Sequence, residues 1–282
     1  MKKLLVLTFF LSLWAGIIFY IIKASSYHEQ RRAEVVCTKV VVHVEDSASR
    51  SFLSAQIVLD LLSEHQLNPY GVERNKIDIH AIESYLREVM YVKDVDVYMN
   101  MLGQMHIDLA QRRPMARFIA DGGYDFYLSD DNHILPISED YVEYVPVVSG
   151  SIEFPFSADY VGELLLQTDN KGEKVEKKFA ESDIFLSNLI NFVRYIEKDK
   201  FWDTQIVQLN VSKEQPQGEP TIEIVPRIGS HTILLGGVEH YQTKMQKMRD
   251  CYEYGMDTTM WKHFAHLDIQ YSGQIIGIEK TK

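Results

Sequence analysis

The amino-acid sequence predicts an α+β protein that begins with one apolar helix and continues into two folded regions. Three observations predict this class. Residues 4–22 form an uncharged apolar run, residues 35–112 mix strand-like and helix-like periodicity, and residues 113–282 consist mainly of short β-rich segments with a few helical stretches. About 250 residues follow the apolar run, which suits two modest domains better than one.

The first 34 residues predict a tail, a membrane helix and a tether. Residues 1–3 are a short basic tail, and residues 4–22, at 1.5 Å per helical residue, nearly match the ~30 Å hydrocarbon core of a bilayer. Residues 23–34 are read as the tether, since the stretch after Lys23 is polar and aperiodic and extends to at most about 35 Å.

A cleaved signal peptide is the alternative interpretation of this segment, with Ala24-Ser25-Ser26 as its cleavage site. The length of the apolar run favours an uncleaved anchor. Basic residues flank the run on both sides, so their count does not set its orientation. A tiny basic tail followed at once by an apolar run is typical of a signal-anchor, which leaves the tail in the cytoplasm and exports the rest.

Residues 35–112 predict a small sheet covered by two helices. Residues 35–44 are rich in β-branched residues, and Ser54 and Asp78 are suited to cap two amphipathic helices. The first helix is predicted to bury Ile57, Val58, Leu61 and Leu62. Two alternating strands follow, joined by a turn at Gly103. The segments 35–44 and 92–100 are predicted to form the sheet with one edge open, although ordinary core packing also explains them.

Residues 113–282 predict a mixed β domain with peripheral helices. Expected strands cover 115–120, 124–128, 145–148, 204–211, 221–225, 232–235, 267–271 and 274–278, and expected helices cover 182–198 and 239–254. Ser272-Gly273 suggests a tight reversal or a bulge between the last two strands.

Composition and motifs argue against several function classes. The net charge of −11 is spread along the chain without a basic run, so it predicts no nucleic-acid partner. The sequence contains no HExxH, GxSxG, GxxxxGK[ST] or post-strand GxGxxG motif, so we expect no enzyme, no small-molecule substrate and no cofactor.

Two residue sets leave an alternative open. His263, His266 and Asp268 have a spacing that can hold a metal, but histidines beside aromatic residues are more typical of a protein surface, and no metal is expected. Cys37 and Cys251 are either two unpaired small apolar residues or one long-range disulfide.

The order of parts resembles the bacterial FtsQ/DivIB family of cell-division proteins, and residues 35–112 resemble a POTRA domain. The motifs that carry the resemblance are each weak, but they occur in order along the chain: DIHAIESYL at 78–86, QRRPMA at 111–116, YL at 127–128 before the turn at 130–136, PVVSG at 146–150, LLG at 234–236 and LDIQY at 267–271.

This resemblance implies a non-enzymatic scaffold of the division machinery in the bacterial inner membrane, with its bulk in the periplasm at the division site. It implies binding to the single-pass proteins FtsB and FtsL, and a link to septal wall synthesis proteins of the FtsW and FtsI type. The family's C-terminal domain accepts its partner by strand addition at its last strand, which maps to Tyr271, Ser272, Gly273, Gln274, Ile275, Ile276, Gly277 and Ile278.

The chain departs from the family pattern at two positions. Gln270 and Gly237 stand where a basic residue is frequent in the family, so we expect backbone pairing and apolar contact, rather than salt bridges, to hold an acidic partner. From periodicity alone, Tyr271, Ile275 and Ile276 fit the core of the β domain equally well. A POTRA-bearing envelope transport component, or a chaperone for outer-membrane proteins, is the alternative function.

Overall fold

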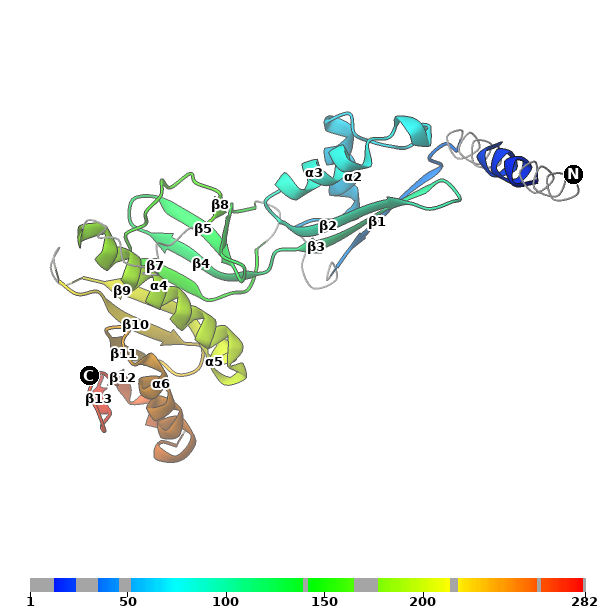
Figure 1. Ribbon diagram of the computed structural model, residues 1–282. Coiled ribbons are helices and arrows are strands. Elements are labelled where there is room, and N and C mark those ends of the chain that lie inside the picture. Colours follow the sequence, from blue (N-terminus) through cyan, green and yellow to red (C-terminus); the bar gives the residue numbers. More distant parts are fainter. Residues whose placement is uncertain are drawn as a thin grey trace, which may run out of the picture. The chain divides into compact units, whose positions relative to one another are not determined.

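A computed structural model describes residues 13–23, 35–45, 52–138, 142–164, 177–213, 218–257 and 260–280 of the 282-residue chain, with side chains of the long helix from residue 184 onward (Figure 1). The chain divides into two compact units, Met1–Gln111 and Arg112–Lys282.

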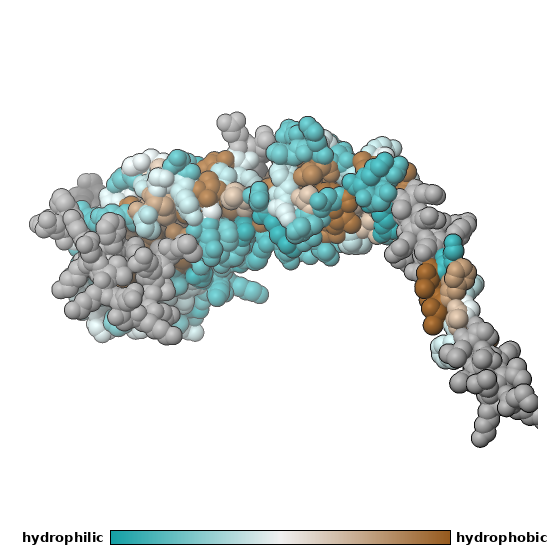
Figure 2. Space-filling model, turned by 45° about the horizontal axis from the view of Figure 1, so that its top comes forward, coloured by the Kyte–Doolittle hydropathy of each residue, from teal (hydrophilic) through white to brown (hydrophobic). Residues whose placement is uncertain are grey.

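Residues 13–23 are helical and carry exposed apolar side chains, among them Trp14, Phe19 and Tyr20. Figure 2 shows hydrophobic surface along this stretch. No helix among the described residues is both long and apolar enough to cross a membrane. Residues 1–12, which include most of the first half of the expected anchor, and residues 24–34 of the tether lie outside the described part.

The two helices of the first unit begin at the caps that the sequence indicates. Ser54 accepts a hydrogen bond from the backbone N–H of Ile57 at the start of α2 (Ala55–Glu64), and Asp78 accepts one from Ala81 at the start of α3 (Ile79–Glu88). A single 3₁₀ turn, η1 (Arg74–Lys76), lies between them.

A three-stranded sheet carries these helices, in the order β1 (Lys39–Val44), β3 (Gln104–Gln111), β2 (Val92–Met99). Strand β3 is parallel to β1 and antiparallel to β2. Apolar side chains that alternate along β2 and β3 are buried against the helices, together with Val58, Leu62, Ile82 and Leu86. Strand–helix–helix–strand–strand periodicity therefore predicts the packing of this unit.

Three details of the first unit correct the expectation. The first strand begins at Lys39, not at residue 35. Ile57 is exposed, because only Val58 and Leu62 of α2 turn fully inward. The segments 35–44 and 92–100 both contribute strands to the sheet, as expected, but β3 lies between them, so both β1 and β2, and not one of them, are edge strands within the described residues.

The second unit contains a ten-stranded sheet. Its order is β13, β12, β11, β10, β9, β7, β4, β5, β6, β8. In chain order the strands are β4 (Pro114–Ala120), β5 (Tyr124–Ser129), β6 (His133–Leu135), β7 (Val147–Gly150), β8 (Gly162–Glu163), β9 (Ile206–Ser212), β10 (Thr221–Pro226), β11 (Thr232–Gly236), β12 (Phe264–Asp268) and β13 (Ile276–Glu279).

Helices cover one face of this sheet and leave the other open. Buried side chains of α4 (Lys177–Lys198) and α6 (Tyr241–Asp250) join the core with Phe118, Val148 and Leu209 from neighbouring strands. Arg117, Ser149, Gln208, Glu223 and His266 alternate with the core positions and stay partly exposed on the opposite face. The unit is therefore a mixed sheet with helices on one face, which fits the expected α+β class.

Several boundaries in the second unit differ from the expectation. The long helix begins at Lys177 instead of residue 182, and residues 204–205 belong to a short helix, α5 (Lys200–Gln205), which Asp199 caps. The last helix begins at Tyr241, after His240 in a left-handed conformation, and residues Cys251–Gly255 continue it as a π turn (η2). The last two strands are Phe264–Asp268 and Ile276–Glu279, not 267–271 and 274–278.

Candidate functional site

Strand β13, which forms the C-terminal edge of the ten-stranded sheet, is the most exposed strand of that sheet. All four residues of β13 are exposed, and within the described residues the strand pairs only with β12. Pairing is antiparallel and matches Leu267 with Gly277 and Asp268 with Ile276. An edge strand of this kind presents unpaired backbone groups to solvent.

Register shows which backbone groups face outward. The N–H of Lys280 donates to the carbonyl of His263 and so points toward β12. Because N–H directions alternate along a strand, the N–H groups of Ile276 and Ile278 also face β12, while those of Gly277 and Glu279 face outward. The bulge beside this pairing is an extra residue on β12, between Phe264 and His266, so the alternation along β13 is regular.

The two faces of β13 carry different side chains. Ile276 and Ile278 are 41% and 43% exposed and share the open face of the sheet with their pairing partners Asp268 and His266. Gly277 lies on the other face, beneath the ring of Phe264, and a Cβ at this position would collide with that ring. The edge therefore offers two apolar side chains and a flat, glycine-containing inner face.

Two lysines of α6 bond to backbone carbonyls near this edge, Lys247 in the connection before β13 and Lys244 at the end of β11. The Lys247 ammonium donates to the carbonyls of Ile269 at 3.0 Å and Gln274 at 2.8 Å, and also to that of Tyr271. Lys244 donates to the carbonyls of Leu235 at 3.1 Å and Gly237 at 2.7 Å. Burial lowers the pKa of both lysines below the usual range. Each ammonium thus supplies hydrogen bonds to backbone carbonyls of this region.

A buried histidine joins the segments on either side of α6. His231 lies just before β11, and its Nδ1 is 3.2 Å from the carbonyl of Trp261, which can only accept. Nδ1 therefore carries the proton, and Nε2 accepts from the Tyr252 hydroxyl at 2.6 Å. Burial lowers the pKa of His231 and raises that of Tyr252. Burial therefore favours the neutral form of His231.

The residues expected at the site divide into two groups. Ile276, Gly277 and Ile278 lie in β13, whereas the five expected residues 271–275 belong to the connection before it. Tyr271 is 52% exposed, and Ile275 packs against the core. The core interpretation is therefore wrong for Tyr271 and Ile276 and correct for Ile275.

Sequence reasoning missed the residues that support the edge. Lys247, Phe264 and Lys280 contact β13 or its flanking residues. Lys280 donates to the carbonyl of Lys262 at 3.0 Å and to the Ser230 hydroxyl. A lysine on an amphipathic helix reads as a solvated residue, so the sequence carries no signal for this role. Gln270, which was singled out as a departure, packs its side chain against Gly236.

The groups considered for metal or disulfide chemistry form neither a metal site nor a disulfide within the described residues. His266 Nδ1 is 2.8 Å from the Thr232 hydroxyl, and Asp268 accepts from the backbone N–H of Gln270. No set of three metal-ligating side chains gathers within the described ranges. Cys37 and Cys251 are both free thiols.

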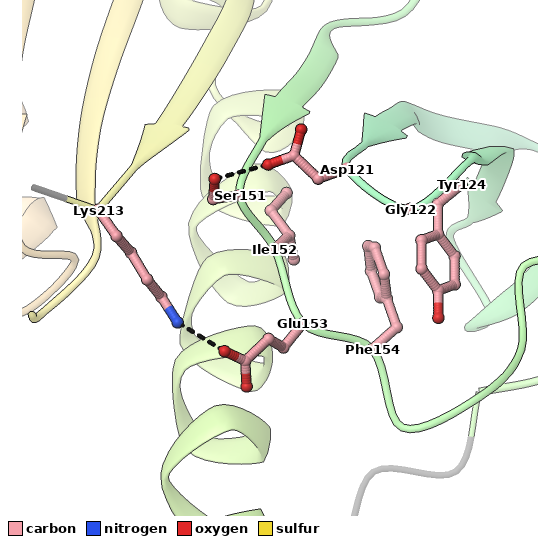
Figure 3. A pocket seen from close by; sticks show the side chains of 8 residues that line it. All are labelled: Asp121, Gly122, Tyr124, Ser151, Ile152, Glu153, Phe154 and Lys213. Carbon is pink, nitrogen blue, oxygen red and sulfur yellow. Dashed lines mark hydrogen bonds and ion pairs between the residues drawn. The ribbon is translucent and has the colours of Figure 1, made fainter. Parts of the chain in front are cut away.

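A shallow pocket of about 720 Å³ lies elsewhere in the second unit, between the β4–β5 turn, the segment after β7 and Lys213 (Figure 3). Its polar groups already have partners: Ser151 donates to Asp121 at 2.6 Å, and Lys213 pairs with Glu153 at 2.8 Å. The ring of Phe154 lies 4.7 Å from that of Tyr124. These contacts describe a packed surface without convergent reactive groups.

Comparison with known proteins gives two matches that fit these units. A family model described as FtsQ/DivIB, C-terminal related, matches residues 113–278, which is more than half of the chain. A second, described as a POTRA-like domain, matches residues 35–110. No curated protein matches the chain. Both matching families are of a non-enzymatic scaffold type.

Proposed function

Because the chain belongs to the FtsQ/DivIB family, we propose that it is a membrane-anchored scaffold of bacterial cell division. It acts without catalysis, by binding other single-pass division proteins of the FtsB and FtsL type at β13. Through them it links early division proteins to septal wall synthesis of the FtsW and FtsI type.

The observation that carries this proposal is the exposed edge at β13. An incoming strand can bond to the outward-facing N–H groups of Gly277 and Glu279, while its side chains contact Ile276 and Ile278. Lys244 and Lys247 lie nearby, but their ammonium groups are used by the protein's own carbonyls. Backbone pairing and apolar contact therefore supply the affinity, in place of salt bridges.

The anchor belongs to the same proposal. Residues 4–22 span the inner membrane once, residues 1–3 stay in the cytoplasm and residues 23–34 tether a POTRA-like domain, 35–112, and a C-terminal domain, 113–282, in the periplasm. The helical, apolar and exposed residues 13–22 support this arrangement. No observation favours the transport alternative.

A single proline tests the edge without removing a bond of the protein's own sheet. Glu279→Pro deletes an outward N–H, and edge strands tolerate proline at such positions. We expect it to abolish co-purification of the FtsB-type partner from detergent-solubilised membranes, with an unchanged thermal unfolding curve. Full recovery of the partner on a folded Glu279→Pro chain would overturn the proposal.

The opposite end of the same sheet supplies the matched control. Strand β8 is the other edge strand, and the N–H of Leu164 donates to Asn132 at 2.7 Å, so the N–H of Glu163 faces outward. Glu163→Pro makes the same chemical change at the wrong edge and should leave partner recovery intact. A fluorescent fusion of the parent chain should form a ring at midcell, whereas an even envelope signal would support the transport alternative.

A further inference from the structure

One end of the first unit carries an exposed apolar patch. The turn between β2 and β3 presents Met101 and Leu102, which are 75% and 78% exposed, and Tyr70 and Val36, at 67% and 40%, belong to neighbouring segments. We call these four residues the hairpin-tip patch. Patches of this kind on a soluble surface mark contact with a membrane or a protein.

Backbone contacts bring the four residues together. Thr38 N–H donates to Gly103 O at 2.9 Å, and Gly71 N–H donates to Cys37 O at 2.8 Å. A Cβ on Gly103 would lie 2.6 Å from Val36 O, so the hairpin turn and the chain before β1 are in close contact. The parallel register of β1 and β3 sets the start of β1 and the turn at the same end of the sheet (Figure 1).

The turn is fixed, so the exposure of its apolar side chains is a stable feature of the fold. Asn100 Oδ1 accepts from the N–H groups of Leu102 at 2.9 Å and Gln104 at 3.0 Å, and its side-chain amide donates to Gln104 Oε1. Gly103 has a positive φ of 78°, which closes the turn.

Charge changes sign along the same unit. At the patch end lie Lys39, Arg74 and Lys76, with Glu73 as the acidic neighbour. Arg74 donates to Met99 O at 2.7 Å, directly before the turn. Glu45, Asp94 and Asp108 lie toward the other end of the strands. Apolar and aromatic side chains next to basic ones are the composition of a segment that rests in a bilayer interface with anionic headgroups.

The covalent connection to the anchor keeps this end of the first unit near the membrane. Val35 follows the tether of residues 23–34, whose stretch after Lys23 extends to at most about 35 Å. The patch lies where the chain enters the unit. We propose that the hairpin-tip patch docks into the outer surface of the lipid bilayer and holds the POTRA-like unit against it. This inference rests on the membrane anchor of the proposed function.

The test uses the full chain reconstituted into vesicles of phosphatidylethanolamine and phosphatidylglycerol. Leu102→Cys carries an environment-sensitive fluorophore, and labelling of the parent chain gives the background from Cys37 and Cys251. Lipids brominated in the upper acyl chain should reduce the fluorescence at residue 102 by about twofold or more if the tip lies about 5–10 Å into the interface. Met101→Cys is the second variant at the same turn.

Ile57→Cys is the matched control, because Ile57 is also an exposed apolar residue but lies at the far end of the sheet, where Leu53 N–H donates to Gln111. Position 57 should show no quenching above background. Equal quenching at 102 and 57, or none at 102 in chains that float with the vesicles, would overturn the docking and leave the anchor standing. If the fluorophore at residue 102 becomes shielded from water only when the FtsB-type partner is added, the hairpin-tip patch binds a protein and the membrane docking is overturned.

Flotation separates this inference from the proposed function. Chains that fail to float with the vesicles would overturn the anchor and the docking together. Binding of the FtsB-type partner at β13 does not depend on the patch. Leu102→Asp should therefore still recover the partner, and adding Glu279→Pro to it should still abolish that recovery.

Discussion

The interior of the second unit and its C-terminal edge are stabilised by different means. At the interior, α4 sets Leu189, Phe192 and Val193 fully into the core against strands with neighbours on both sides. At the edge, β13 has four exposed residues, and the Lys247 ammonium bonds to the connection before it. Apolar burial therefore stabilises the core. The edge strand stays exposed because no further strand in the described part of the chain covers it, and polar contacts hold the connection that leads into it.

The largest expected effect lies on the interior side of this comparison. Phe192→Ala removes a ring with no exposed surface, and we expect a loss of about 3–5 kcal/mol in the free energy of unfolding. Ile278→Ala, at a 43% exposed position, should change that free energy by less than about 0.5 kcal/mol while weakening partner recovery. Urea unfolding of both variants measures the difference, and similar losses at the two positions would contradict the distinction.

A smaller effect is expected where the edge meets the core. Gly277→Ala places a methyl group against the Phe264 ring, and we expect about 1–3 kcal/mol of destabilisation from the displaced ring. The double variant Gly277→Ala with Phe264→Leu should recover part of this loss. Equal stability of Gly277→Ala and the parent chain in thermal unfolding would show that the ring moves aside without cost.

Lys247 tests whether polar contacts hold the connection before β13. Lys247→Met keeps the aliphatic stem but removes three donors to the carbonyls of Ile269, Tyr271 and Gln274. We expect a loss of about 1–2 kcal/mol, because water can satisfy the two outer carbonyls, and faster amide hydrogen exchange in residues 271–276. Lys200→Met, on an exposed position of α5, is the control and should leave exchange in this loop unchanged.

The smallest effect concerns pH. Burial lowers the pKa of His231 below its ordinary 6.5, so the unfolded chain binds a proton that the folded chain rejects. The contribution of His231 to the free energy of unfolding is complete above about pH 6.5. It decreases as pH falls below that value, by at most about 1.4 kcal/mol per pH unit, and is lost once pH passes the lowered folded pKa. His231→Asn retains a donor for Trp261 and should flatten this dependence in acid titrations of unfolding. His263→Asn is the control and should leave this pH dependence unchanged.

Sequence patterns predict the two units well where burial follows a single period. Ser54 and Asp78 cap helices because their side-chain oxygens suit exposed N–H groups, and the alternation in β2 and β3 matches burial residue by residue. The central position of β3 was not predicted, because strand order depends on pairing between distant segments.

The site was only partly accessible to sequence reasoning. Ile276 and Ile278 lie on an exposed edge strand, but the strand expected at 274–278 begins only at Ile276, and residues 274–275 belong to the connection before it. Lys247, 24 and 27 residues away in sequence, donates to the carbonyls of Tyr271 and Gln274 in that connection. Local propensity cannot report a contact of this kind.

Backbone hydrogen exchange at β13 tests the central claim most directly. The full chain in detergent is measured with and without the FtsB-type partner, and residues 276–280 are compared with the edge strand β8. Strand addition predicts that the amides of Gly277 and Glu279 become protected on binding, while the amide of Glu163 does not change. Unchanged exchange at Gly277 and Glu279 in a saturated complex would contradict the account.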